Sequence, residues 1–111
     1  MKKSSAVLAT PAGLSKAGSQ WYQRLTTEFE IRDEAGRLLL ETAMRAFDRA
    51  EAARALLDKD GVVLVDRWGQ SKPHPAVVIE RDARAGMLSA LKMLNLDIEP
   101  LRDRAGRPGG S

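Results

Sequence analysis

The stretch that decides the fold is residues 33–61, which read DEAGRLLLETAMRAFDRAEAARALLDKDG. Asp33 suits a helix N-cap, because its carboxylate can accept a hydrogen bond from an unpaired first-turn amide, and Gly61 is typical of a helix C-terminus. Between them, apolar residues recur at spacings of three and four, as on one face of a helix. The pattern predicts a helix from Asp33 to about Lys59, roughly 39 Å long. Its apolar stripe consists of Leu39, Ala43, Ala46 or Phe47, Ala50, Ala53 and Leu57.

Further apolar residues widen this stripe beyond a single seam; they are Leu38, Leu40, Met44 and Leu56. One partner helix cannot cover so broad an apolar arc. Surplus apolar surface on so small a protein indicates contact between subunits. The candidate residues for that contact are Leu39, Ala43, Phe47, Ala50, Leu57 and, from a later segment, Trp68.

Two segments precede this helix. Residues 1–13 are rich in Lys, Ser, Ala, Thr, Pro and Gly without periodicity, which predicts a flexible N-terminal arm. Residues 14–29 form a second candidate helix, with Ser15 as its N-cap. Trp21 begins a run of apolar residues at every fourth position, so we expect one apolar face with Trp21 in the core.

The segment after Gly61 predicts a short β-hairpin. Residues 62–65 are a β-branched run, and residues 70–72 can return beside them with Gly69 in the turn. Two strands alone are marginally stable. The hairpin must therefore pack on a helix or pair with a neighbouring subunit.

A third helix is predicted from Ala76 to about Leu94. Pro75 can take its first position, where the missing N–H costs nothing. Glu80 and Arg84 have the i,i+4 spacing of an ion pair on the helix surface. The apolar stripe of this helix consists of Ala76, Ile79, Ala83, Met87, Ala90 and Leu94.

The whole chain has the length and composition of one globular domain: 111 residues, of which 43% are apolar and 30% charged. We expect a mainly α fold over residues 14–101. In it, an antiparallel helical hairpin carries an N-terminal helix, and a short β-hairpin joins its two long helices. Residues 102–111, with a Pro-Gly-Gly stretch, are expected to be a disordered tail.

Composition narrows the chemistry. The chain has no cysteine and a single histidine, so disulfides and thiolate sites are excluded and a metal site is not expected. No apolar run is long enough to cross a bilayer, and the four-residue run near the N-terminus is too short for a signal peptide. No glycine-rich phosphate loop follows a strand. We therefore expect a protein without enzymatic activity, cofactor or membrane association.

Two groups of residues superficially resemble catalytic sites. Asp66, Ser71 and His74 have the residue types of a hydrolase triad, but nothing in the sequence argues for an oxyanion hole. His74 lies between two prolines, and the start of a helix explains it better. The acidic pairs, Asp58 with Asp60 and Glu80 with Asp82, are better explained as solvated helix surface than as a Mg²⁺ site.

The formal net charge of +3 permits contact with nucleic acid without requiring it. Residues 1–32 carry five basic and two acidic side chains, and residues 62–96 carry five and three. The basic surplus therefore lies in the N-terminal segment and in the second half. The candidate DNA contacts are Lys2, Lys3, Lys16 and Arg24 in the first group, and Arg67, Lys72, Arg81 and Arg84 in the second.

The block of residues 66–75, DRWGQSKPHP, is followed at residues 80–84 by ERDAR. These motifs resemble a subfamily of phage terminase small subunits, in which two helices precede a D-R-x-G-Q-x-K-x-H-P turn and a helix with E-R-D-A-R follows it. The resemblance covers about residues 14–101, and Pro-His-Pro between a glycine turn and a charged helix is not a generic pattern.

This resemblance implies a function. Terminase small subunits form homo-oligomeric rings, recognise double-stranded viral DNA and regulate a separate large subunit, which supplies the ATPase and nuclease. It further implies a phage or prophage protein in the host bacterial cytoplasm, with the two long helices and the β-hairpin assembled into a ring.

Two other interpretations remain open. One is a small, dimeric DNA-binding regulator that uses the first two helices as a helix-turn-helix, although the second helix is long and Ala-rich where a groove-reading helix is short and polar. The other is a structural phage assembly adaptor without DNA affinity. Sharp binding of a short palindrome would favour the regulator, and the absence of binding to phage end DNA at any salt would favour the adaptor.

Overall fold

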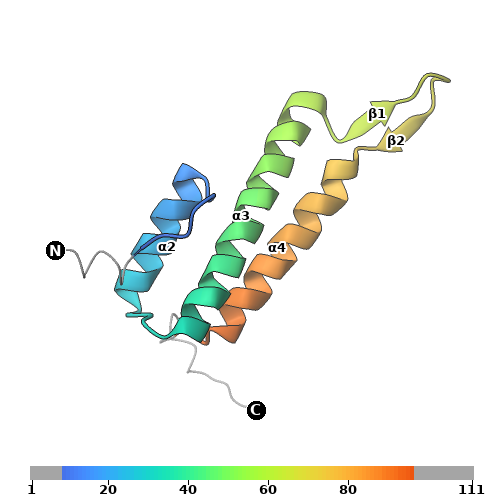
Figure 1. Cartoon of the computed structure of the whole chain (residues 1–111). Helices are drawn as coiled ribbons and strands as arrows, with labels where there is room; N and C mark the ends of the chain where they lie inside the picture. Colours follow the sequence, from blue (N-terminus) through green and yellow to red (C-terminus); the bar gives the residue numbers. More distant parts are fainter. Residues whose placement is uncertain (1–8, 97–111) are drawn as a thin grey trace, which may run out of the picture.

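The computed structural model describes residues 9–96, and within them it is mainly helical with one small antiparallel sheet. Its elements are α2 (Lys16–Glu28), α3 (Glu34–Asp60), β1 (Val63–Val65), β2 (Ser71–Pro73) and α4 (Pro75–Met93). α3 and α4 lie side by side as an antiparallel helical hairpin, and α2 packs on the first half of α3 (Figure 1). The predicted order and type of elements are confirmed. Lys2, Lys3 and the predicted C-terminal tail lie outside the described residues.

The ends of α3 form as the sequence predicts. The Asp33 carboxylate accepts a hydrogen bond from the Gly36 N–H at 2.8 Å, and Gly61 closes the helix at a φ of +82°, which a residue with a side chain rarely adopts. The Gly61 N–H donates to the Leu57 carbonyl at 2.7 Å. Both expected caps of the long helix are thereby confirmed.

A close contact fixes α2 against α3. Ser15 caps α2 by accepting from the Gly18 N–H at 2.9 Å, and it donates its own N–H and hydroxyl to the Asp48 carboxylate at 2.7 and 2.5 Å. A Cβ on Gly18 would lie only 2.6 Å from an Asp48 oxygen. Glycine at this position therefore lets the two helices approach closely.

The buried face of α2 is displaced by one residue from the predicted stripe. Tyr22 is 3% exposed, and Gly18 and Thr26, each four residues away, share its face against α3. Trp21 is 43% exposed, so its expected place in the core was wrong. The physical reason is the small residue at position 18, which brings that face, and not the neighbouring one, closest to α3.

α3 and α4 pack mainly through small side chains. Seven of the twelve buried apolar residues in the described chain are alanines. Those on α3 are Ala43, Ala46, Ala50 and Ala53, and those on α4 are Ala76, Ala83 and Ala90. Leu40 is the one large side chain in the described chain that is fully covered. Ile79, expected in the stripe of α4, is exposed because the buried row passes through Ala76 and Ala83.

This packing corrects part of the expected subunit interface. Ala43, Ala50 and Leu57 are buried inside the chain, so the structure leaves them no surface for a second copy. Leu39 and Phe47 are half-buried, and Trp68 is exposed. The exposed large apolar side chains of α3 are instead Leu38 and Leu56, which lie beside the predicted stripe and not in it. Leu38 is 64% exposed and Leu56 is 47% exposed.

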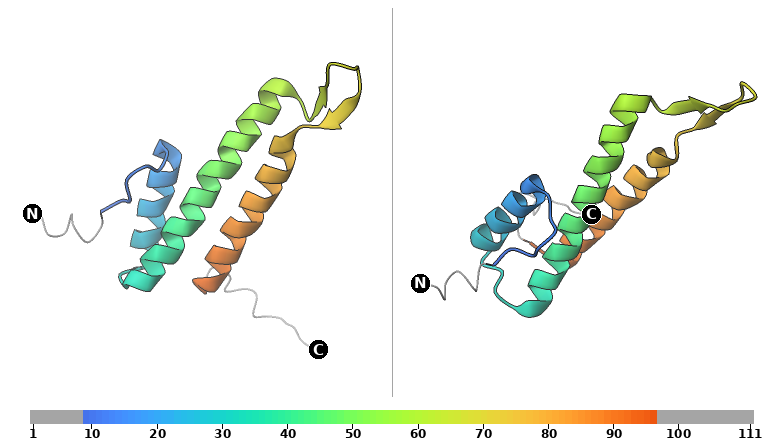
Figure 2. Two further views of the ribbon diagram at one scale, coloured as in Figure 1. Left: turned by 45° about the vertical axis from the view of Figure 1, so that its right-hand side comes forward. Right: turned by 45° about the horizontal axis from the view of Figure 1, so that its top comes forward.

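The β-hairpin projects beyond the ends of α3 and α4, away from α2 (Figure 2). β1 and β2 pair antiparallel, with Val63 opposite Pro73, Leu64 opposite Lys72 and Val65 opposite Ser71. All six strand residues are exposed. α4 approaches the base of this small sheet, where Val77 lines a pocket with Val63, Lys72 and Pro73, but the strand side chains stay exposed.

Candidate functional site

The tip of the hairpin is built by Asp66 and Gly69. The Asp66 carboxylate accepts from the N–H groups of Trp68 and Gln70, each at 2.9 Å, and the Asp66 N–H donates to the Gln70 carbonyl at 3.0 Å. Gly69 has a φ of +77° and donates its N–H to the Asp66 carbonyl at 3.0 Å. An acidic residue and a glycine at these two positions thus form a closed turn. The residues between them are free to face outward.

The turn presents a cationic aromatic surface. Trp68 is 73% exposed, and the Arg67 guanidinium carbon lies 4.8 Å from the centre of its indole ring. Lys72 is exposed on the adjoining strand. A guanidinium stacked on indole keeps its charge and gains a defined orientation. The hairpin therefore carries one positive charge and a flat ring at its tip and a second positive charge midway along β2, all exposed to a nucleobase or an apolar partner surface.

His74 ties the base of the hairpin to both long helices. Its Nδ1 accepts from the Ala76 N–H at 3.0 Å, which caps α4, so the ring hydrogen lies on Nε2 and is donated to Asp60 at 2.9 Å. The His74 backbone N–H donates to the Val62 carbonyl at 2.8 Å. One buried residue thus links the end of α3 and the start of α4 through its side chain and the first rung of the hairpin through its backbone N–H.

These bonds leave no hydrolase triad at the hairpin. Both ring nitrogens of His74 are engaged, and the Asp66 carboxylate is engaged with turn amides. The interpretation of His74 as a residue at the start of a helix is confirmed. Sequence reasoning missed Asp60 as its partner. The signal was available, since Asp60 ends the helix before the hairpin and His74 precedes the helix after it.

The other predicted DNA contacts do not gather at the tip. Arg84 bridges Glu51 of α3 at 3.1 Å and Glu80 of α4 at 3.2 Å, which confirms the expected i,i+4 pair. The hydrogen bond to Glu51, aided by Glu80, raises the pKa of Arg84 above its ordinary value. The Arg84 side chain is 37% exposed, so it forms a bridge between the two helices at the surface of the helical hairpin. On α4, Arg81 Nε lies 3.2 Å from Oδ1 of its neighbour Asp82.

The remaining two described candidates lie on α2, away from the hairpin. Lys16 is exposed in the first turn, and the Arg24 guanidinium lies 5.2 Å from the ring centre of Trp21. The structure therefore brings Arg67 and Lys72 together at one end of the molecule and leaves Lys16 and Arg24 as a separate pair.

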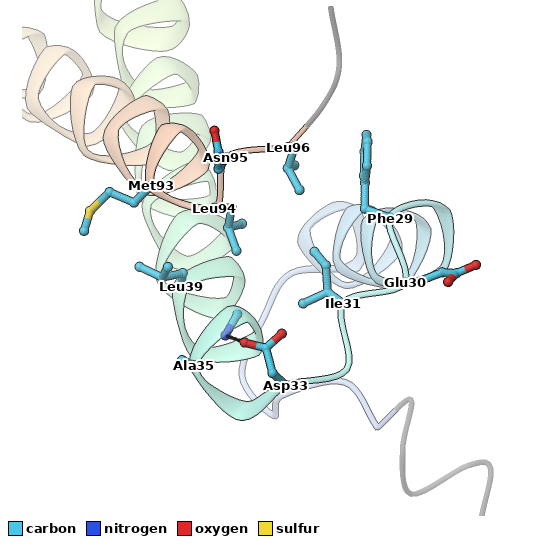
Figure 3. A pocket seen from close by; sticks show the side chains of 11 residues that line it. Phe29, Glu30, Ile31, Asp33, Ala35, Leu39, Met93, Leu94, Asn95 and Leu96 are labelled. Atoms are coloured by element: carbon cyan, nitrogen blue, oxygen red, sulfur yellow. Dashed lines mark hydrogen bonds between the residues drawn. The ribbon is translucent and has the colours of Figure 1, made fainter.

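A pocket of about 430 Å³ lies at the opposite end of the helices, where α2 ends, α3 begins and α4 ends (Figure 3). Asp33 is held there as the N-cap of α3, and Glu30 points away from the cavity. The rest of the lining is mostly apolar, including Phe29, Leu39 and Leu94. The pocket therefore offers no free acid or base.

Within residues 9–96, no group of three or more acidic, histidine or cysteine side chains lies close enough to hold a metal ion. No helix in that range has the length and hydrophobicity of a membrane span. Comparison with protein-family models, with curated proteins and with solved structures found no match in any of the three.

Proposed function

We propose that this protein is a terminase small subunit: a non-catalytic, ring-forming component of a viral DNA-packaging motor. In this proposal it recognises double-stranded viral DNA in the host bacterial cytoplasm. It also regulates a large subunit that supplies the ATPase and nuclease. The motif of residues 66–75 supports the proposal, because its Asp, Gly and His residues each have a defined task in building one projecting hairpin.

The observation that carries the proposal is this hairpin, whose strands are exposed in the described part of the chain and which carries Arg67 and an exposed tryptophan at its tip and Lys72 on β2. A two-stranded sheet without a third strand or a supporting helix is marginal in water. Self-association supports the hairpin and at the same time multiplies a small positive charge per copy.

Exposed apolar side chains elsewhere support self-association independently. Twelve large apolar residues are exposed in residues 9–96, as many as the buried apolar residues of the same range. On the helices they are Trp21, Leu38, Leu56, Val78, Ile79, Leu88 and Met93. These residues replace the predicted Ala43, Ala50 and Leu57 as the candidates for helix contacts between neighbouring copies.

Native mass spectrometry and DNA gel shifts test the proposal together. We expect a closed oligomer, and binding of phage end DNA that weakens steeply as salt rises. The double variant Arg67→Ala, Lys72→Ala should lower the salt slope by about one for each phosphate that the protein no longer neutralises. The matched control is Arg49→Ala, Lys92→Ala, which removes two exposed cations away from the hairpin.

Three outcomes contradict parts of this proposal. A monomer at micromolar concentration would overturn the ring. Equal salt slopes for the two double variants would remove the hairpin tip from the DNA contact. An oligomer with no DNA affinity at any salt would favour the assembly adaptor. The helix-turn-helix interpretation is supported less, since α3 is 27 residues long and packs against both α2 and α4.

A further inference from the structure

The outer edge of β1 carries unpaired backbone groups. In an antiparallel pair, residues that bond across the pair alternate with residues whose N–H and C=O point away from it. Val62 bonds with His74 and Asp66 bonds with Gln70, so the register places Val63 and Val65 in the outward-pointing class. Both residues are exposed, at 52% and 67%. The edge therefore offers two N–H donors and two C=O acceptors.

The outer edge of β2 is different. By the same alternation, Ser71 and Pro73 point their backbone groups outward on that side, and Pro73 has no N–H to donate. Proline on an edge strand is a common device against further strand pairing. The hairpin thus has one open edge and one obstructed edge.

We infer that β1 pairs antiparallel with β1 of a second copy, about a two-fold axis at Leu64, to give a four-stranded sheet in the order β2-β1-β1-β2. The sequence Val63-Leu64-Val65 reads the same in both directions, so the edge is complementary to itself. Val63 of each copy bonds with Val65 of the other, and the two Leu64 residues face each other. All four outward backbone groups on each β1 strand gain hydrogen-bond partners. The resulting sheet has four strands, which is more than the three needed for independent stability.

Charge complementarity favours a second copy as the occupant. The antiparallel register directs the tip of each hairpin toward the base of the other, where α3 ends. Arg67 at the tip then approaches the Asp58 carboxylate at the base, which is 70% exposed and pairs with Arg54 of its own chain at 3.3 Å, while Asp60 is held by His74. Pairing of β1 with β2 of a neighbour would instead sacrifice one hydrogen bond at Pro73. The obstructed outer edges end the sheet at four strands and prevent a growing fibre.

This interface goes beyond the proposed function and needs no DNA. A two-fold interface is isologous, whereas a simple ring is built from head-to-tail interfaces. In the proposed assembly the hairpin edge therefore pairs copies that belong to two different rings. Its consequence is an even number of copies in the assembly.

Single-cysteine crosslinking tests the pairing, because the chain has no cysteine of its own. Directly opposed residues of the non-hydrogen-bonded class lie about 4.5 Å apart at Cα, within the range that a disulfide spans. Under mild oxidation Leu64→Cys should give a covalent dimer in most of the protein. The matched control, Ser71→Cys, lies on β2, where the two copies are about 14 Å apart across three strand spacings, and it should not crosslink.

The outcomes are distinct. Equal crosslinking of the two variants, or none for Leu64→Cys, overturns the pairing. Preferential crosslinking between a Leu64→Cys copy and a Lys72→Cys copy overturns the two-fold geometry, because it reports β1 against β2.

A second variant checks the edge without a disulfide. Val63→Pro removes an outward N–H and spares the bonds within the hairpin, so helical circular dichroism should be unchanged. Association should weaken roughly tenfold or more, since each pair of copies forms two fewer hydrogen bonds. A wild-type oligomer whose mass and affinity Val63→Pro leaves unchanged would refute the edge pairing and leave the proposed ring standing. A monomeric wild type would refute both.

Discussion

The two hairpins of this molecule, one of α-helices and one of β-strands, differ in how far their apolar side chains are exposed. Between α3 and α4, alanines and Leu40 are covered, and the helices need nothing outside the chain at that seam. In the β-hairpin that joins them, Val63 and Val65 are more than half exposed. The seam between the two helices is thus closed within one chain, whereas the β-hairpin leaves its apolar side chains exposed.

His74 lies at the boundary between these two regions. It caps α4, donates to Asp60 of α3 and bonds to the first rung of the hairpin. A rigid helical seam can in this way hold a projecting hairpin in a defined direction, although the strand side chains stay exposed. The direction matters because an interaction element must be oriented before it meets its partner.

The largest expected effect comes from breaking the covered region. Leu40→Ala should lower the free energy of unfolding by about 3 kcal/mol, because it removes a fully buried side chain and leaves a cavity. Leu64→Ala, in the exposed hairpin, should change it by less than about 0.5 kcal/mol. Urea unfolding followed by circular dichroism, at concentrations too low for association, measures both. A similar loss of stability for the two variants would show that the β-hairpin is packed on the helices after all.

A smaller effect is expected at the junction. His74→Ala removes both the cap of α4 and the bond to Asp60, so we expect a loss of about 2 kcal/mol in the free energy of unfolding. His74→Asn keeps an acceptor for the Ala76 N–H and is too short to reach Asp60, so it should lose about half as much.

Urea unfolding distinguishes the two contributions at the junction. If His74→Asn proves as costly as His74→Ala, the bond to Asp60, and not the cap, holds the junction. If neither variant changes the stability, the link between the two hairpins does not depend on His74.

Local signals in the sequence were enough to predict the elements. Ser15, Asp33 and Gly61 cap or end helices through contacts with their own neighbours, and these signals placed the helix boundaries to within a residue or two. Gly69 likewise marked the turn, because a positive φ is a local property. The type and order of elements were therefore predictable.

The orientation of faces was predictable only in part. Trp21 and Tyr22 are adjacent aromatic residues, and the periodicity of α2 alone does not decide which of them faces α3. The deciding contact, between Gly18 and Asp48, joins residues 30 positions apart. For the same reason the sequence did not show that Arg84 pairs with Glu51 of the neighbouring helix. Contacts of this kind depend on how two helices are set against each other.

The smallest expected changes in stability come from replacing two glycines, Gly18 in the contact between α2 and α3 and Gly86 on the open surface of α4. Gly18→Ala should destabilise the protein by about 1 kcal/mol, because the added Cβ lies 2.6 Å from an Asp48 oxygen and displaces the carboxylate that binds Ser15. Gly86→Ala is the matched control in the middle of α4. Its Cβ would meet nothing within 4 Å, so the better helix propensity of alanine should stabilise the protein by about 0.5–1 kcal/mol.

Urea unfolding at two protein concentrations measures the change in the free energy of unfolding for each glycine variant. A change that depends on concentration reports an effect on assembly. At the lower concentration, a gain in stability for Gly18→Ala would show that α2 is not held closely on α3. A loss of stability for Gly86→Ala at that concentration would contradict the open surface seen at this position. A loss that appears only at the higher concentration would locate a neighbouring copy against the middle of α4. In that case the uncovered region would extend from the β-hairpin along the outer face of the helix.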